Sequence, residues 1–259
     1  MKIIPIASGS SGNCFFLELG GRKILIDLGV TAKMMTAALT GNGYSLSEVE
    51  AVLLTHSHND HVRGLDVCMK KLSAPLFTSS ATKETLCLPD ARVLPYGKRT
   101  EILPELFVTA FRTPHDAIGS VGFIIETGGE KLGYATDVGH VTDEMRQLLR
   151  GSDLIVLEAN HDVDMLRQGR YPVFLKRRIL SDNGHLSNDD CGEAVEYFES
   201  CGTKNFLLAH LSRENNTPRM ALECVRKCVP YDDVHVDVLP PEGDCLLVYD
   251  KPESEENET

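Results

Sequence analysis

The amino-acid sequence predicts an α+β fold in which two β-sheets pack face to face and helices cover their outer surfaces. The chain begins with a strand-rich segment, continues with alternating strand and helix patterns, and then goes through this order again. Two sheets between two helix layers would bury the apolar face of every element. The sequence contains neither an internal repeat nor a low-complexity linker, so we expect residues 1–249 to form one domain.

Apolar runs and turn residues place the elements of the first half. Short apolar runs bounded by turns or by polar residues predict strands at residues 3–7, 14–19, 23–27 and 51–55. An apolar period of three to four residues predicts one helix at residues 32–39. The same period predicts a second helix through Val62, Leu65, Met69 and Leu72.

The same signals place the elements of the second half. Strands are expected at residues 106–111, 121–126, 131–136, 153–158, 205–209, 234–238 and 245–249. Helices are expected at residues 141–149, 189–198 and 217–228.

The formal net charge of the chain is −12, which suits a nucleic-acid partner poorly as a whole. Affinity for nucleic acid depends largely on neutralising phosphates, so such a role would need a local basic patch or bound metal ions. Residues 250–259 hold five acids and one lysine, and we expect them to form a disordered acidic tail.

Neither a membrane nor an export signal is indicated. No apolar run approaches the ~18 residues that a membrane-spanning helix needs, and the run after Lys2 is too short for a secretory signal. We therefore expect a cytoplasmic protein. The eight cysteines are scattered without a CxxC pair, and in that compartment they are expected to be buried as small apolar residues.

Three histidines and an aspartate follow the apolar run at residues 51–55 within six positions. Neutral imidazole suits zinc, iron or manganese, and carboxylate suits the harder cations. Residues two apart on an extended segment point the same way, so His56 and His58 can hold one ion together. Asp60 and His61 follow as the chain turns, and they can hold a second ion.

This motif, His56-x-His58-x-Asp60-His61 after an apolar strand, resembles the metal-binding motif of the metallo-β-lactamase superfamily. The resemblance extends over nearly the whole chain and implies the four-layer αββα sandwich of that superfamily. It also implies seven ligands for two divalent metal ions (zinc, manganese or iron), namely His56, His58, Asp60, His61, His115, Asp137 and His210. In this arrangement Asp137 would bridge the ions, Asp27 would orient a ligand imidazole, and Asp116 would orient His115.

Other stretches resemble one branch of the superfamily. Residues 184–188, followed by a helix and the strand before His210, are laid out as in the phosphodiesterase branch that includes ribonuclease Z. Residues 9–13, 160–162, 171–179, 181–188 and 211–216 are similar to the YycJ/WalJ-type branch, which implies an exonuclease acting on DNA.

The resemblance also implies catalytic and substrate-binding residues. Asp60 would orient or deprotonate the nucleophile, and His185 would protonate the leaving oxygen or hold the scissile phosphate. Lys176 and Arg177 could hold a phosphate backbone, and Asn215 could contact the substrate. We assign no ligand role to His140, His161 or His235.

The predicted function is therefore phosphodiester hydrolysis in nucleic acid with two metal ions, with DNA favoured over RNA. The alternatives are an RNA-processing nuclease and a metal-dependent hydrolase of a thioester, lactone or β-lactam, since the same ions can polarise a carbonyl. A di-iron redox protein would need a flavin domain for which this chain has no room, and a metal-stabilised binding module would bind DNA without cutting it. The sequence leaves open the metal, the strand preference, the mode of cleavage and the oligomeric state.

Overall fold

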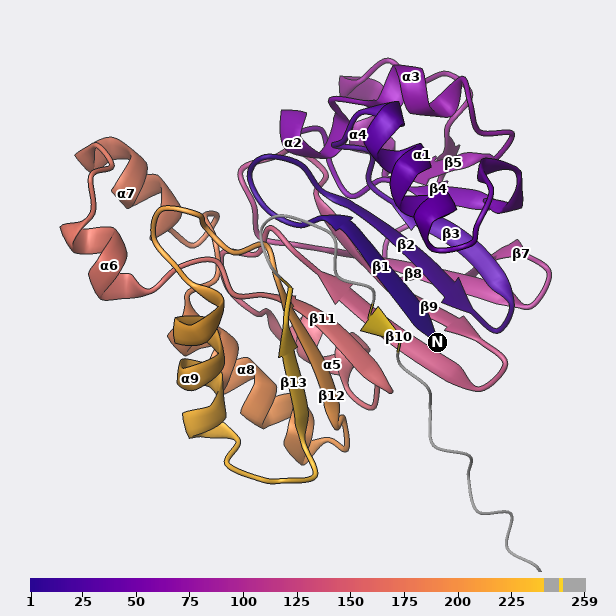
Figure 1. The fold of residues 1–259 in the computed structure, drawn as a ribbon. Coiled ribbons are helices and arrows are strands. Elements are labelled where there is room, and N and C mark those ends of the chain that lie inside the picture. The colour runs from indigo at the N-terminus through magenta and orange to yellow at the C-terminus, as the bar shows by residue number, and fades with distance from the viewer. Residues whose placement is uncertain (240–246, 249–259) are drawn as a thin grey trace, which may run out of the picture.

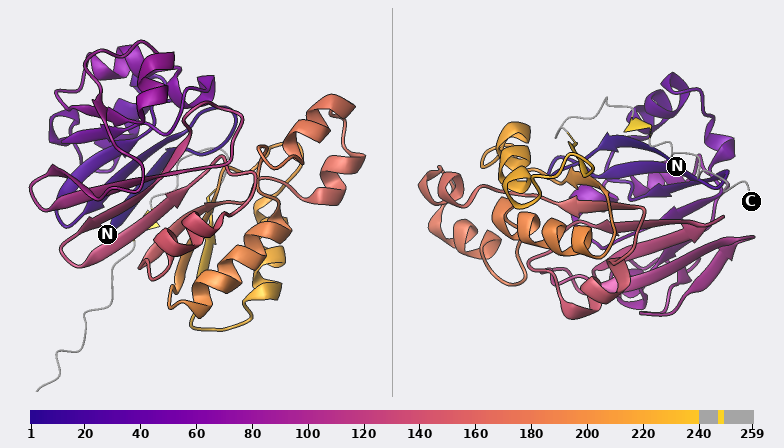
Figure 2. Two further views of the ribbon diagram at one scale, coloured as in Figure 1. Left: turned by 180° about the vertical axis from the view of Figure 1, so that it is seen from behind. Right: turned by 90° about the horizontal axis from the view of Figure 1, so that it is seen from below.

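The computed structural model describes residues 1–239 and 247–248, and it contains two seven-stranded sheets packed against each other (Figure 1). The strand order of the first sheet is β14-β1-β2-β3-β4-β5-β6, and that of the second is β13-β12-β11-β10-β9-β8-β7. Helices cover the outer face of each sheet in all three views (Figure 2). The predicted four-layer αββα sandwich is thus confirmed.

The first sheet comprises β1 (Lys2–Ala7), β2 (Cys14–Leu19), β3 (Arg22–Ile26), β4 (Ala51–Leu53), β5 (Leu76–Thr78), β6 (Arg92–Val93) and β14 (Leu247–Val248). The second comprises β7 (Thr100–Leu103), β8 (Leu106–Arg112), β9 (Val121–Thr127), β10 (Glu130–Ala135), β11 (Leu154–Glu158), β12 (Asn205–Ala209) and β13 (His235–Val238).

The helices belong to three groups. Beside the first sheet lie α1 (Ala32–Gly41), the 3₁₀ turn η1 (Leu46–Glu48), α2 (Asn59–Val62), α3 (Leu65–Met69) and α4 (Ser80–Thr85). Beside the second lie α5 (Asp143–Leu149), α8 (Asn188–Ser200) and α9 (Pro218–Cys228). The pair α6 (Val163–Gln168) and α7 (Val173–Ile179) projects from the end of the sandwich (Figures 1 and 2).

Three apolar cores hold the four layers together, and alternation along the strands explains how. In β2, Phe15 and Leu17 lie in the core between the sheets, while Phe16 packs in the core beneath the helices of the first sheet. In β8, Val108 faces the first of these cores and Phe111 faces the core beneath the helices of the second sheet. Central strands are therefore apolar on both faces, which is why they appear in the sequence as continuous runs.

Parallel pairing brings several strand ends to one edge of the sandwich. Strands β10, β11 and β12 pair in parallel, and β3 pairs in parallel with β4. Strand β8 runs in the direction of β10, because both are antiparallel to the strand between them. The residues that follow β4, β8, β10, β11 and β12 can therefore meet at this edge.

The sequence patterns missed the shortest elements. Strands β5, β6 and β7 and helices α4, α6 and α7 were not expected, and the helix predicted after the histidines is divided into α2 and α3. The division falls at Gly64, whose N–H donates to the carbonyl oxygen of Leu28 and where a Cβ would lie 1.8 Å from the carbonyl oxygen of Val30. The backbone approaches the β3–α1 loop too closely there for any residue except glycine.

Two other predictions were correct only in part. Cys14, Cys68 and Cys191 are buried as expected, but Cys201, Cys224 and Cys228 are only partly buried, and Cys87, which follows the C-cap of α4, is exposed. Cys245, part of the strand predicted at residues 245–249, and the acidic tail at residues 250–259 lie outside the described residues, which include only residues 247–248 of that strand.

Candidate metal centre

Three histidines from two loops form the first cluster of possible metal ligands. His56 and His58 follow β4, and His115 follows β8. One nitrogen from each lies within 4.8 Å of the others, and Nδ1 of His58 is 3.1 Å from Nε2 of His115. His56 is completely buried, and its Nε2 atom has no hydrogen-bond partner.

A second cluster lies directly beside the first. It comprises Asp60 and His61 at the start of α2, and His210 just after β12. Asp137, which follows β10, stands between the two clusters: its carboxylate is 3.1 Å from Nε2 of His61 and 3.5 Å from Nε2 of His115. The seven residues predicted as ligands therefore converge, although they come from four distant parts of the chain.

The unpartnered atoms of the clusters fit metal ions. Nε2 of His56, Nε2 of His210 and Oδ2 of Asp137 are buried without a hydrogen-bond partner. Leaving such an atom unsatisfied costs about 1–3 kcal/mol. Mixed imidazole and carboxylate ligands suit zinc, manganese or iron, and a divalent cation would satisfy these atoms together. Their role as ligands, the number of ions and the metal stay predictions.

The electrostatics of the clusters favour a cation. Burial opposes protonation of His61, but the carboxylates of Asp137 and Asp27 outweigh this effect and raise the pKa of His61 to about 10. Burial also disfavours the charged form of Asp137, yet the imidazoles of His210 and His61 hold its pKa well below the ordinary range. The site therefore keeps a central negative charge and attracts positive charge to the surrounding imidazoles.

Carboxylates outside the clusters fix the orientation of the imidazoles. Asp27 is fully buried and accepts a 2.7 Å hydrogen bond from Nδ1 of His61, as predicted, so Nε2 of His61 points to the centre. Thr55 donates to the same carboxylate. Asp116 lies 3.4 Å from Nε2 of His58 and 3.5 Å from Nε2 of His115, whose Nδ1 atom faces the carbonyl oxygen of Gly184 instead. The prediction that Asp116 orients His115 is therefore wrong: the carbonyl oxygen of Gly184 does so, because Asp116 lies near Nε2 and not near Nδ1.

Glu158 is the main residue that the sequence reasoning missed. This fully buried carboxylate ends β11 and accepts 2.8 Å hydrogen bonds from Nδ1 of both His185 and His210. It also accepts a 2.6 Å bond from the backbone N–H of Val138. Burial opposes its charge, but His185 and His210 lower its pKa to about 2. A strand that ends in a carboxylate was the available signal, since β10 leads to Asp137 in the same way.

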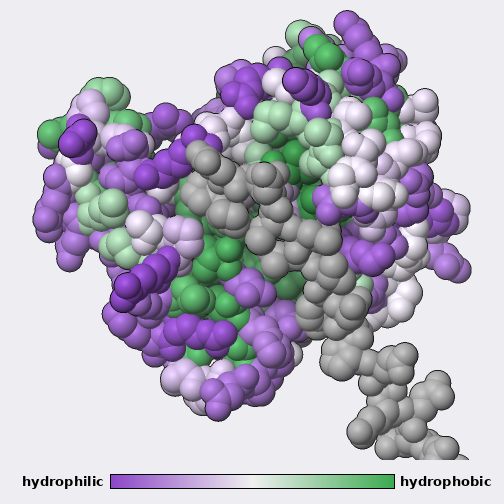
Figure 3. All heavy atoms as spheres, viewed as in Figure 1, coloured by the Kyte–Doolittle hydropathy of each residue, from purple (hydrophilic) through white to green (hydrophobic). Residues whose placement is uncertain are grey.

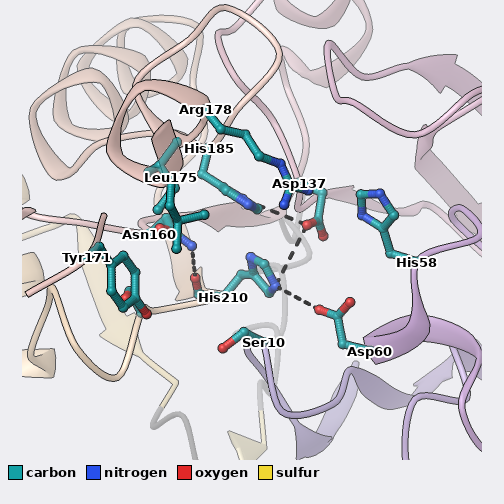
Figure 4. Close-up of a pocket in the computed structure, with 12 residues that line it drawn as sticks. Ser10, His58, Asp60, Asp137, Asn160, Tyr171, Leu175, Arg178, His185 and His210 are labelled. Atoms are coloured by element: carbon teal, nitrogen blue, oxygen red, sulfur yellow. Dashed lines mark hydrogen bonds and ion pairs between the residues drawn. The ribbon is translucent and has the colours of Figure 1, made fainter. Parts of the chain in front are cut away.

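The clusters open into a cavity of about 270 Å³ (Figure 4). His58 and Asp60 face the cavity on one side, and His185 and residues of the helical pair α6–α7 face it on the other side. The complete lining is Ser10, His58, Asp60, Asp137, Asn160, Tyr171, Leu175, Arg178, Ile179, His185, His210 and Ser212. Both predicted catalytic residues, Asp60 and His185, are therefore at the cavity.

The predicted substrate-binding residues do not line this cavity. Lys176 donates 2.7 Å hydrogen bonds to the carbonyl oxygens of Arg167 and Gly169, so its ammonium group joins α6 to α7. Arg177 is exposed on α7. Asn215 is buried, and its side chain donates to Ser212.

The third member of the basic trio lines the cavity instead. Arg178 extends from α7 toward the clusters (Figure 4) and forms an ion pair with Asp116. The guanidinium therefore connects α7 to the carboxylate beside His58.

Comparison with known proteins adds family evidence to this geometry. A family model described as "Beta-lactamase superfamily domain" matches residues 22–211. The chain is 34% identical to the exodeoxyribonuclease YycJ of Bacillus anthracis over 83% of this chain and 84% of that protein. It is 35% identical to the exodeoxyribonuclease WalJ of Streptococcus pneumoniae over 85% of each chain.

A solved structure shares the fold. The metallo-β-lactamase fold protein YhfI of Bacillus subtilis superposes with a TM-score of 0.71 at 16% identity, and the match covers 94% of this chain and 98% of that one. No helix among the described residues is both long and apolar enough to cross a membrane.

Proposed function

The chain belongs to the metallo-β-lactamase superfamily, and we propose that it is a hydrolase that cleaves phosphodiester bonds in nucleic acid, as an exonuclease on DNA. The observation that carries this proposal is the convergence of five histidines and two aspartates beneath a cavity that His185 and Arg178 also line. The match to two exodeoxyribonucleases over most of both chains supports DNA as the substrate. The cytoplasmic location stays a prediction.

Each of the two clusters would hold one metal ion. His56, His58 and His115 would hold one divalent ion, and Asp60, His61 and His210 would hold another, with Asp137 between them. When bound, such ions supply Lewis-acid activation of water and neutralise the phosphate oxygens.

In this proposal Asp60 receives the proton of the attacking water. Burial raises its pKa, but His210 and His61 outweigh burial and lower it, so the carboxylate is ionised at neutral pH. The amide of Asn13 donates a 3.2 Å hydrogen bond to Oδ2 of Asp60 and holds the carboxylate in place. Asp60 can therefore orient the nucleophile and accept a proton from it.

In this proposal His185 gives a proton to the leaving oxygen. Its Nδ1 atom is hydrogen-bonded to Glu158 at 2.8 Å, which leaves Nε2 to face the cavity. Burial lowers the pKa of His185, but the carboxylate of Glu158 outweighs burial and raises it above the ordinary value. The imidazole can thus carry a proton at neutral pH and donate it to the departing sugar oxygen.

The test uses three polymers and a matched histidine control. Protein loaded with Mn²⁺ or Zn²⁺ is incubated with end-labelled single-stranded DNA, double-stranded DNA and RNA. We expect mononucleotides or short products from DNA and almost none with His61→Ala. His235→Ala, an exposed histidine on β13, should behave as wild type.

Two outcomes would contradict the proposal. One is the survival of all three polymers with protein that holds its metal ions. The other is rapid hydrolysis of a thioester or a lactam together with inert bis-p-nitrophenyl phosphate, which would favour carbonyl substrates.

A further inference from the structure

The helical pair α6–α7, here called the arm (residues 163–180), differs in charge from the rest of the protein. It contains five arginine or lysine residues and one carboxylate, in a chain whose net charge is −12. Arg167, Arg170 and Arg177 are exposed and form no ion pair within the described part of the chain. The arm therefore provides the local basic surface that the overall composition does not.

One face of the arm continues directly into the cavity. Leu175 and Arg178 are three residues apart in α7, which places them on one side of the helix, and Tyr171 directly precedes the N-cap residue Pro172. All three line the cavity that Asp137 and His185 also line. A chain that leaves the metal centre on this side would pass along α7.

The next position around α7 carries an exposed aromatic ring. Phe174 is 74% exposed. At about 100° per residue, its side chain emerges about 40° from that of Arg178 and about 60° from that of Arg177. The order around the helix is therefore cavity face, Arg178, Phe174 and Arg177. Figure 3 shows apolar surface among hydrophilic surface on the arm.

A single aromatic ring between two cations matches one kind of partner. Exposed aromatic side chains stack on bases that are not paired, and neighbouring arginines neutralise the phosphates on either side. A protein partner would need a broader apolar surface, whereas the side chain of Val173, which is 65% exposed, emerges about 100° from that of Phe174. In a duplex the base faces are already stacked, so only a single strand can use Phe174 fully.

We propose that the arm binds single-stranded nucleic acid as it enters the cavity: Phe174 stacks on a base, and Arg177 and Arg178 contact the adjoining phosphates. This inference rests on the proposed nuclease function and names its substrate form, a single-stranded end. Because Phe174 contributes no atom to the metal centre, its role is in binding and not in bond cleavage.

The test measures binding without cleavage. Protein stripped of metal with a chelator is titrated into a fluorescein-labelled 12-nucleotide single strand, and anisotropy is recorded. Phe174→Ala should weaken binding about tenfold, and Phe174→Trp should restore it. Val173→Ala, at an exposed apolar residue whose side chain emerges about 100° from that of Phe174, should bind as wild type. Arg177→Gln should reduce the salt dependence, expressed as the slope of log K against log salt, by about 0.7.

A second measurement separates this inference from the nuclease proposal. Metal-loaded Phe174→Ala should hydrolyse bis-p-nitrophenyl phosphate at the wild-type rate, because Phe174 does not line the cavity that this small substrate would occupy. Unchanged affinity of Phe174→Ala for the single strand would overturn the inference. Equal loss with Phe174→Ala and Val173→Ala would overturn it too, because the effect would then not depend on the aromatic ring. If the wild type cuts no polymer but Phe174→Ala still loses affinity, the nuclease proposal fails and the binding role stands.

Discussion

Replacing Glu158 by glutamine tests whether this one carboxylate organises the second cluster. The substitution keeps the shape of the side chain but turns one carboxylate oxygen into an NH₂ group. One oxygen of Glu158 accepts bonds from His185 and His210, and the other accepts the backbone N–H of Val138. If the NH₂ group faces Val138, it meets the backbone N–H, and if it faces His185 and His210, both imidazoles lose the acceptor that holds their Nδ1–H groups.

The magnitude follows from these contacts. A buried donor left without a partner costs about 1–3 kcal/mol, so we expect the metal-free variant to lose that much unfolding free energy. Outer groups that orient metal-binding imidazoles typically change metal affinity or activity by about 10- to 100-fold. The loss should fall on the ion held with His210, because no hydrogen bond among the described residues joins Glu158 to His56, His58 or His115.

Two assays check this prediction for Glu158→Gln. Denaturant unfolding of metal-free protein gives the change in stability, and competition with a coloured chelator gives the metal affinity of each site. Glu126→Gln, a partly exposed glutamate in β9, is the matched control and should leave the metal affinity unchanged. Wild-type affinity at both sites of Glu158→Gln would refute the role that we assign to this carboxylate.

Three further predictions concern the same centre. Asp27→Asn turns one acceptor oxygen into an NH₂ group, which must face either Nδ1 of His61 or the backbone N–H of Thr55, and it should lower the affinity of that metal site about 10- to 100-fold, measured by equilibrium dialysis. His185→Gln should slow DNA cleavage by about 10²- to 10⁴-fold but barely slow bis-p-nitrophenyl phosphate hydrolysis, because p-nitrophenolate leaves without a proton. In metal-free protein the pKa of His61 is raised from 6.5 to about 10, so the proton is held at neutral pH and must leave when metal binds. Apparent metal affinity should therefore rise with pH up to about 10, and calorimetry in buffers of different ionisation enthalpy should detect the released proton.

The sandwich and the convergence of the metal centre could be anticipated from the sequence for a physical reason. Central strands such as β11 are buried on both faces, so they stand out as continuous apolar runs. Polar groups directly after such runs must lie at a sheet edge, and His210 and Asp137 do so. The family resemblance carried by the histidine motif was confirmed by the family match.

The arm could not be anticipated in the same way. Helices α6 and α7 bury only Leu166 and Ile179, so they lack the regular apolar face by which a helix is detected. The basic trio Lys176–Arg178 could be recognised in the sequence. Which of its three side chains faces the cavity could not be predicted, since the direction of each depends on how α7 packs against the rest of the protein. In the structure Lys176 donates hydrogen bonds to the backbone of the arm, whereas Arg178 lines the cavity.

The backbone at the centre shows how the fold accommodates its polar residues. Asp27, Asp137 and His210 adopt positive φ angles of 59°, 57° and 57°, a region that favours glycine. Such a conformation costs a non-glycine residue of order 1 kcal/mol, and it persists only where surrounding contacts fix it. The N–H of Asp27 bonds to the carbonyl of Leu53, and the N–H of His210 bonds to Ser8 Oγ. Glycine would relieve the strain but would remove the carboxylate or imidazole from the centre, so the strained turn after each strand is what aims these side chains at a common point.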